Sequence, residues 1–399
     1  MRKPNQMSRT MSKCTVLVTL ALSFVLSLAV ASAAAPAPIK IGAAGPFTGD
    51  LSKIGLDSLN AIQMAVDEVN EAGGIAGRKV VVVVGDDAAD PSKALLVAEK
   101  FIGDPAVAGV IGPMNSSTAA ASLPSYQTAK LVVISQSATN PDLTERGFTV
   151  FHRLCPRDDA QGPVAARFMV QELKAKRIYL LDDKSTYGQG LADQIEKALK
   201  GLGKVGLERG QISGDDKDFS AILTRIKGFG PDLIFMALPN PAQAAALVKQ
   251  AAGLGVKAKF MAGDGVKEKD QYIKGAAGLA EGSYVTAIGQ DIREVPAAKE
   301  FIAKFEKKYG AMSIFSGQSY EATKVLLAAI KKVAASANGK DLDRAKVLSA
   351  VKGLSGYKGI LGFPIAFNAK GDVLGAKIYV FQVKNGDFAE VKGYAAATK

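Results

Sequence analysis

Two clusters rich in serine and threonine follow short apolar runs in this chain. Residues 112–118 come after the apolar run 107–111, and residues 135–141 come after the run 131–134. Such runs are typical of buried parallel strands, and open α/β sheets bind ligands beyond the carboxyl ends of their strands. Hydroxyls beside the N–H groups of a starting helix form a receptor for a small anion such as a carboxylate. Each cluster alone is more typical of helix capping, but two on successive strand ends favour binding.

The first 35 residues contain no acidic side chain. Four basic residues precede an apolar run over residues 16–30, and small residues with Ala-x-Ala spacing follow it. This order is typical of a secretory signal peptide, whose apolar run is too short for a comfortable membrane span. We therefore predict a signal peptide over residues 1–33 and export of the mature protein to the periplasm.

Composition limits the remaining possibilities. Loss of the signal peptide removes Cys14 and leaves Cys155 as the only thiol, so the mature protein relies on its core rather than on an internal disulfide. The 399 residues predict two domains. The net charge of +12 is spread along the chain without a basic run interleaved with aromatics, which predicts that nucleic acid is not a partner.

Strand-like apolar runs and amphipathic helical segments alternate along most of the chain. This alternation predicts parallel sheets covered by helices on both faces. After residue 285 helical segments dominate over residues 297–351, and a β-rich tail covers residues 360–391. Because these strands are too many for one sheet, we expect two similar lobes with a cleft between them, and residues 151–156 as a crossing segment.

Motifs for catalysis or cofactor binding are weak. Residues 201–206 have the spacing of a dinucleotide fingerprint but follow a helix and precede a strand, so they predict a helix stop. His152, the only histidine, and Cys155 are expected to be structural. The acidic stretch 86–90 before Pro91 predicts a helix start. The sequence therefore predicts neither an enzyme, nor a cofactor, nor a metal site.

Longer ordered segments carry a resemblance to a known family. The chain resembles the periplasmic binding proteins for branched-chain amino acids, the type I receptors of ABC importers, over essentially the whole mature length. The segments that match are residues 41–45, 70–75, 86–91, 137–144, 182–190 and 217–220. The resemblance implies an α/β fold of two doubly wound parallel-sheet lobes joined by a multi-strand hinge. Lobe 1 would comprise residues 37–157 and 289–377, and lobe 2 residues 158–288 and 378–399.

The resemblance also implies a ligand site. Residues at the positions of Ser116 and Thr139 hold the ligand α-carboxylate in the family, and a backbone carbonyl at the position of Ser137 accepts from the α-ammonium. The opposite lobe supplies Tyr187 and an acid, usually Glu in the family but Asp264 here, and an aromatic matching Phe315 borders the side-chain pocket. The ligand-binding residues predicted in this way are Ser116, Ser137, Ala138, Thr139, Tyr187, Asp264 and Phe315.

Three departures bear on ligand specificity. Ala89 and Asn115 occupy the positions of the family's disulfide cysteines. Residues 238–241 replace a loop that often carries two tyrosines, and Ile54 replaces an aromatic that commonly walls the pocket. The amino-acid contacts are therefore expected to persist while the side-chain pocket differs.

The expected function is capture of an amino acid, branched-chain or otherwise aliphatic, by a monomer that delivers it to an inner-membrane ABC permease. Lobe closure around the ligand would drive capture. A binder of an amide, urea or aromatic acid on the same fold is the alternative. A secreted hydrolase using Ser116 or Ser137 is disfavoured, because a serine nucleophile needs a base and His152 is the only imidazole.

Overall fold

The computed structural model describes residues 36–203, 205–337 and 340–395. The predicted signal peptide over residues 1–33 lies outside the described residues. The chain divides into a unit Met1–Ala37 and a compact unit Pro38–Lys399, and the second unit carries every element discussed below. Among the described residues, no helix has both the length and the apolar character needed to cross a membrane.

The first sheet has five strands in the order β2-β1-β3-β4-β5, and every neighbouring pair is parallel. All five residues of β3 are buried, as expected for a central parallel strand. The strands are β1 (Ile39–Gly45), β2 (Val80–Asp86), β3 (Val107–Ile111), β4 (Val133–Ser135) and β5 (Phe151–Arg153). The predicted run 131–134 is therefore displaced toward the C-terminus, since β4 begins at Val133.

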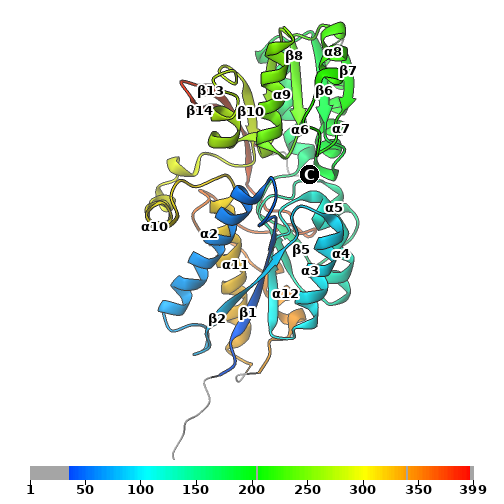
Figure 1. The fold of residues 1–399 in the computed structure, drawn as a ribbon. Helices are drawn as coiled ribbons and strands as arrows, with labels where there is room; N and C mark the ends of the chain where they lie inside the picture. Colours follow the sequence, from blue (N-terminus) through cyan, green and yellow to red (C-terminus); the bar gives the residue numbers. More distant parts are fainter. Residues whose placement is uncertain (1–35, 204, 338–339, 396–399) are drawn as a thin grey trace, which may run out of the picture. The chain divides into compact units, whose positions relative to one another are not determined.

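Helices from two distant parts of the chain cover this sheet (Figure 1). One packed pair joins α2 to α11, and another joins α3 to α4. Asp90 caps α3, whose first residue is Pro91, which confirms the predicted helix start. The helices associated with these segments are α2 (Ser52–Glu71), α3 (Pro91–Gly103), α4 (Ser116–Thr128), α5 (Asp142–Glu145), α10 (Lys299–Tyr309), α11 (Ser316–Ala334) and α12 (Arg344–Lys352).

The second sheet has seven strands in the order β14-β13-β10-β9-β8-β6-β7. Its pairs are parallel from β7 to β10 and antiparallel where β13 and β14 add to the edge. Asn385 and Gly386 both have positive φ in the β13–β14 turn, as a two-residue hairpin turn requires, and this hairpin lies within the predicted β-rich tail. The strands are β6 (Arg177–Asp182), β7 (Gly206–Gln211), β8 (Leu233–Ala237), β9 (Lys259–Ala262), β10 (Tyr284–Ala287), β13 (Lys377–Lys384) and β14 (Asp387–Ala395).

Four α-helices accompany the second sheet, as predicted from the alternating pattern (Figure 1). The helix α7 ends at Gly201 and is followed by β7, which confirms the helix stop and excludes the dinucleotide interpretation. The helices are α6 (Asp158–Arg167), α7 (Thr186–Gly201), α8 (Ser220–Phe229) and α9 (Pro241–Gly253). Short elements complete the fold: π-helices Phe168–Glu172 and Lys269–Lys274, 3-10 helices Asp264–Val266, Ile292–Glu294 and Pro296–Ala298, and the paired strands β11 (Tyr357–Lys358) and β12 (Pro364–Ile365).

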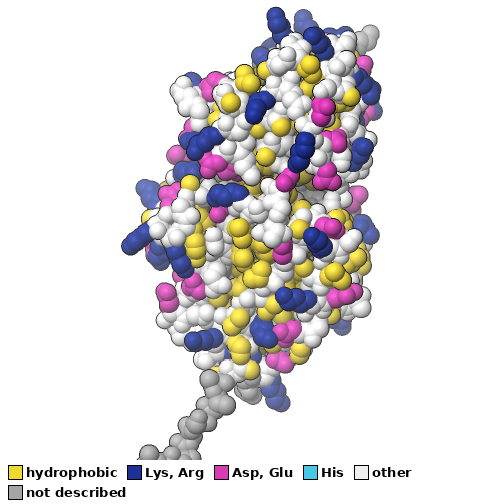
Figure 2. All heavy atoms as spheres, in the orientation of Figure 1, with side chains coloured by type: hydrophobic (Ala, Val, Ile, Leu, Met, Phe, Trp, Pro, Cys, Tyr) yellow, Lys and Arg dark blue, Asp and Glu magenta, His cyan; other side chains and the backbone are white. Residues whose placement is uncertain are grey.

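Charged side chains are mixed on the visible surface. In Figure 2, lysine and arginine side chains are scattered among acidic ones rather than gathered into one basic patch. This distribution agrees with the dispersed basic character of the sequence and offers no continuous track for a nucleic-acid backbone on this face.

Candidate functional site

A small cavity lies where loops from the two sheets meet. Its volume is about 40 Å³, room for only a few waters. It is lined by Leu51, Ile54, Met114, Asn115, Ser116, Ser137, Tyr187, Pro239, Asp264, Gly265 and Phe315. Five of the seven predicted ligand-binding residues are in this set. The polar ones follow the carboxyl ends of β3, β4, β6 and β9, where α/β sheets bind ligands.

Ser116 is the first residue of α4, and its hydroxyl does not act as a helix cap. Within the described part of the chain, the residue before α4 makes no side-chain cap hydrogen bond, and neither does the residue before α5. Ser116 Oγ instead accepts from the Asn140 N–H at 3.3 Å, and Ser117 Oγ accepts from the Thr186 N–H at 3.1 Å. The N-terminus of α4 thus keeps its partial positive charge toward the cavity.

The loop after β4 carries three more predicted residues, of which only Ser137 reaches the cavity lining. Ser137 Oγ donates to the Met114 carbonyl at 2.9 Å. Ala138 and Thr139 are fully buried behind the wall. Among the described residues, no hydrogen bond of normal geometry reaches Thr139 Oγ1 or its backbone N–H, although the hydroxyl lies close enough to Asp158 to stabilise its charge. Thr139 therefore holds its N–H, and a hydroxyl that is directed in part to Asp158, as reserve donors behind the cavity lining.

Asp264 forms the opposite wall, directly after β9. The residue is 4% exposed, and its Oδ1 accepts from Tyr187 Oη at 2.8 Å and from Gln161 Nε2 at 2.9 Å. Burial raises the pKa of Asp264 above its usual value, while the bonds from Gln161 and Tyr187 oppose that shift. This wall thus presents a carboxylate that is poorly solvated and, within the described residues, hydrogen-bonds to an amide and a phenol rather than to a cation.

Asp158 is a second buried carboxylate that the sequence analysis missed. It begins α6 and is fully buried, with Oδ1 accepting from Gln161 Nε2 at 3.2 Å and Oδ2 unpaired among the described residues. Burial, followed by the charge of Asp264, raises the pKa of Asp158 to about 8. An acid in the first turn of a helix is explained locally by the helix dipole, so no signal in the sequence marked it as functional.

Apart from Asn115 and Gly265, the rest of the lining is apolar and surrounds Phe315. Phe315 precedes α11 with φ of +69°, a left-handed conformation that is costly for a bulky residue. Leu51, Ile54 and Met114 complete this surface with Pro239. The cavity therefore joins a polar donor wall and an acidic wall to an apolar patch.

His152 and Cys155 take no part in the lining. His152 is buried in β5 against Phe367, and burial lowers its pKa to about 4, so it is neutral at physiological pH. Burial also raises the pKa of the Cys155 thiol, which keeps it protonated. In the described residues, no group of three or more His, Cys, Asp or Glu side chains is arranged to hold a metal ion.

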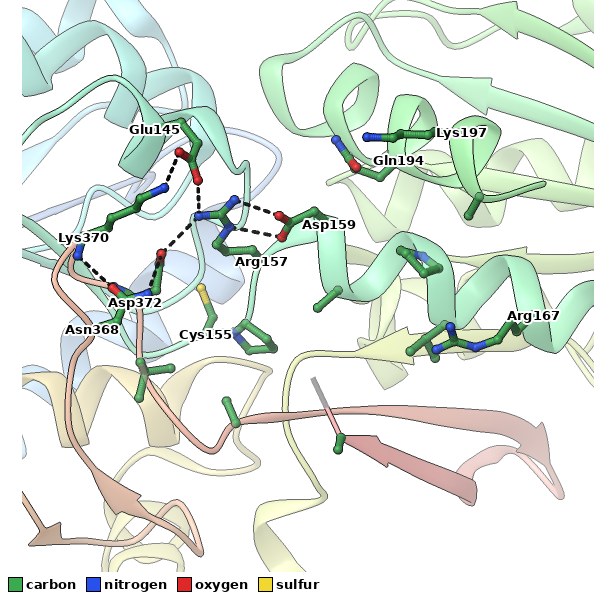
Figure 3. A pocket seen from close by; sticks show the side chains of 18 of the residues that line it. Glu145, Cys155, Arg157, Asp159, Arg167, Gln194, Lys197, Asn368, Lys370 and Asp372 are labelled. Atoms are coloured by element: carbon green, nitrogen blue, oxygen red, sulfur yellow. Dashed lines mark hydrogen bonds and ion pairs between the residues drawn. The ribbon is translucent and has the colours of Figure 1, made fainter. Parts of the chain in front are cut away.

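A larger cavity of about 1010 Å³ lies elsewhere in the molecule (Figure 3). None of the seven predicted ligand-binding residues lines it. We assign the functional site to the smaller cavity because five of the seven predicted ligand-binding residues line it, with Ser116 following the first sheet and Asp264 following the second.

The cavity lies among loops at the carboxyl ends of two α/β sheets and places hydroxyl donors opposite the Asp264 carboxylate, an arrangement suited to binding a small polar ligand. The chain belongs to the periplasmic binding protein family, whose model matches residues 38–387. It is a substrate-binding protein of the ABC-transporter type, which confirms the predicted resemblance and fold class.

Individual relatives agree with this assignment. The chain is 34% identical over 352 residues to "Leu/Ile/Val-binding protein homolog 2" of Brucella abortus, covering 88% of this chain and 92% of the relative. The branched-chain amino acid binding protein LivJ of Streptococcus pneumoniae, solved with isoleucine, has a TM-score of 0.78 at 26% identity and covers 90% of this chain and 99% of its own. A Rhodopseudomonas palustris solute-binding protein solved with benzoate has a TM-score of 0.79 at 19% identity, covering 91% and 98%, which is likeness of fold alone.

Proposed function

We propose that this protein captures an amino acid, branched-chain or otherwise aliphatic, in the periplasm and delivers it to an inner-membrane ABC permease. The observation that carries the proposal is the opposition of the Ser116 hydroxyl and the N-terminus of α4 on one wall to the buried Asp264 carboxylate on the other. A second buried carboxylate, Asp158, accepts from the same Gln161 amide as Asp264. A zwitterionic α-amino acid complements both walls at once.

The donor wall suits the ligand carboxylate. Ser116 Oγ, the N-terminus of α4 and the reserve donors of Thr139 are neutral groups that favour an anion in a site shielded from water. The predicted role of the Ser137 carbonyl is complementary, because it would accept from the ligand ammonium beside them.

The acidic wall suits the ligand ammonium. An uncompensated buried carboxylate is costly, and a bound ammonium would relieve that cost at Asp264 and Asp158 together. The pair shares one amide, that of Gln161, so we expect its two carboxyls to titrate as a coupled unit.

The apolar patch suits an aliphatic side chain. Ile54, Met114 and Phe315 offer no polar partner for a charged or amide side chain. The relatives named for leucine, isoleucine and valine, and the LivJ structure with isoleucine, support this substrate class.

Capture requires opening and closure. Pockets for small ligands usually measure about 300–1,000 Å³, so a cavity of about 40 Å³ must widen to admit an amino acid. We propose that lobe 1, residues 37–157 and 289–377, moves against lobe 2, residues 158–288 and 378–399. Asn140 Nδ2 donates to the Thr186 carbonyl at 2.7 Å, a contact that would break on opening and form again around the ligand.

An aromatic acid is the second candidate, favoured by the fold of the benzoate-binding structure and by the changed loop at Pro239. Such a ligand would fill the donor wall but leave Asp264 and Asp158 facing an apolar ring. The two candidates therefore differ in their need for an ammonium group.

Thermal denaturation of denatured-and-refolded protein against leucine, isoleucine, valine, benzoate, urea and an aliphatic amide tests the proposal. A ligand at one hundred times its Kd adds about 2.7 kcal/mol of stability, which raises the melting temperature measurably. We expect the aliphatic amino acids to stabilise most. Stabilisation by benzoate alone would overturn the amino-acid assignment, and mass spectrometry of the recovered ligand should find it chemically unaltered.

A further inference from the structure

We propose that Arg153 is a positioning residue for the ligand carboxylate. Its guanidinium fixes the loop after β4, so that Thr139 holds its N–H and hydroxyl directly behind the cavity wall formed in part by Ser137, ready for a ligand carboxylate when the cavity opens. The proposal rests on the proposed function only in assuming that the ligand carries a carboxylate. It adds a residue that neither lines the cavity nor was selected from the sequence.

Arg153 ends β5 and is fully buried. Its Nη1 donates to the carbonyls of Ala138 at 2.9 Å and Asn140 at 2.8 Å. Nη2 donates to Thr144 Oγ1 at 2.7 Å, and Nε donates to Asp372 Oδ1 at 2.7 Å. One side chain thus hydrogen-bonds to both ends of the loop 138–140 and links it to Asp372, in the connection between β12 and β13.

The carbonyls of residues 138–140 are all bonded within the protein. Arg153 donates to the carbonyls of Ala138 and Asn140, and the Asp158 N–H donates to the Thr139 carbonyl at 3.0 Å. With its carbonyl held in this way, Thr139 keeps its N–H and hydroxyl free of bonds of normal geometry in the described structure. Donors fixed in advance bind an anion without further reorganisation of the loop.

Only an arginine can make this set of contacts. The planar fork reaches two carbonyls, a hydroxyl and a carboxylate at once, whereas lysine offers a single ammonium on a flexible stem. Asp372 compensates the buried charge. Burial would raise the pKa of Asp372, but the charges of Arg153 and Arg157 and their hydrogen bonds hold it below its usual value.

Arg157 provides a matched comparison. Like Arg153 it donates to Asp372, with Nη1 to Oδ2 at 3.2 Å, and it also binds Glu145 and Asp159 (Figure 3). It reaches Thr144 Oγ1 at 3.2 Å, but within the described residues it does not hydrogen-bond to a carbonyl of the loop. Loss of Arg157 therefore disturbs the same ion-pair network without releasing the loop.

The test compares Arg153→Lys and Arg153→Met with Arg157→Met. Calorimetry measures the affinity of each variant for leucine and for leucinol, in which a hydroxymethyl group replaces the carboxylate. Loss of aligned, charge-assisted donors should lower leucine affinity at least about tenfold in the Arg153 variants, with less than about threefold change for leucinol. Arg157→Met should keep the wild-type leucine-to-leucinol ratio.

Equal losses for the two ligands in the Arg153 variants, or no loss for either, would show that Arg153 is structural only. If neither Arg153 variant folds, Thr144→Val, which removes one acceptor that holds the guanidinium, should lower the leucine-to-leucinol ratio in the same direction by a smaller factor. A wild-type protein that binds benzoate instead of leucine would refute the proposed substrate, and benzoate with benzyl alcohol would then test Arg153 in the same way.

Discussion

The two walls of the cavity differ in the groups that they offer to a charged ligand: neutral hydrogen-bond donors on one side and a carboxylate on the other. The wall from the first sheet uses neutral groups, the hydroxyl of Ser116 and the N-terminus of α4 with Thr139 directly behind them, and Arg153 is buried behind this surface. The wall from the second sheet places the Asp264 carboxylate against a phenol and an amide, and that amide also bonds to the buried Asp158. Donor dipoles are sufficient for an anion, while in the proposed complex the ligand ammonium would face a full charge.

This difference predicts where ligand binding is vulnerable. Neutral donors are numerous on the first wall, so loss of one leaves others in place. The charge of the second wall is concentrated in one coupled pair, and removing part of it leaves a ligand ammonium unpaired in a dry site. We therefore expect larger effects from the acidic wall.

The largest effect is expected for Asp264→Asn. Leucine should lose more than roughly 2 kcal/mol of binding free energy because its ammonium no longer faces a full charge, and stopped-flow kinetics should assign the loss to faster release. The des-amino analogue 4-methylpentanoate serves as the control and should bind unchanged or more tightly. Equal losses for both ligands would mean that Asp264 is structural.

Ser116→Ala and Thr139→Ala should each weaken leucine at least tenfold, since a hydrogen bond to a charged group contributes about 1.5–3 kcal/mol. Ser122→Ala is the matched control, because its hydroxyl bonds to the Thr118 carbonyl within α4 and does not line the cavity. Calorimetry gives the affinities, and circular dichroism checks the fold. Wild-type affinity in both test variants would show that neither hydroxyl contributes to ligand binding.

Asp158 should make both stability and affinity depend on pH. With a pKa of about 8 in the folded protein against about 4 unfolded, it binds more protons when folded, so its contribution to stability is lost as pH rises from about 4 to 8. Leucine should in turn bind severalfold more tightly at pH 8 than at pH 6, with proton release detectable by calorimetry in two buffers. Asp158→Asn should flatten both trends; if the wild type and this variant follow the same pH profile, Asp158 is not the titrating group.

The smallest effect is expected for an exposed ion pair outside the cavity lining. Lys217 pairs with Asp50 at 2.8 Å, with both side chains more than half exposed, and such pairs contribute about 0.2–1 kcal/mol. Asp50→Asn should therefore change leucine affinity less than about fivefold, and 0.5 M salt should erase the difference. A loss as large as that of Asp264→Asn would show that the exposed Lys217–Asp50 pair, rather than the cavity, supplies the main electrostatic contribution to binding.

The sequence by itself determined the features that depend on near neighbours. Alternating strands and helices, the cap at Asp90, the stop at Gly201 and the Asn385–Gly386 turn follow from backbone preference and periodicity over a few residues. The order of the ligand loops also follows, because each polar cluster comes directly after an apolar strand. Ser116 and Tyr187 were predicted as ligand-binding residues from such local patterns together with the family resemblance.

Only the tertiary structure decided which side chains act together. The bonds from Gln161 to both Asp158 and Asp264 join α6 to the loop after β9, and Arg153 joins β5 to Asp372. Each of these residues has an ordinary local explanation, as a helix-start acid or a strand-end base. Their shared burial, and with it the raised pKa of Asp158, arises from packing between distant elements, which no local pattern of residues encodes.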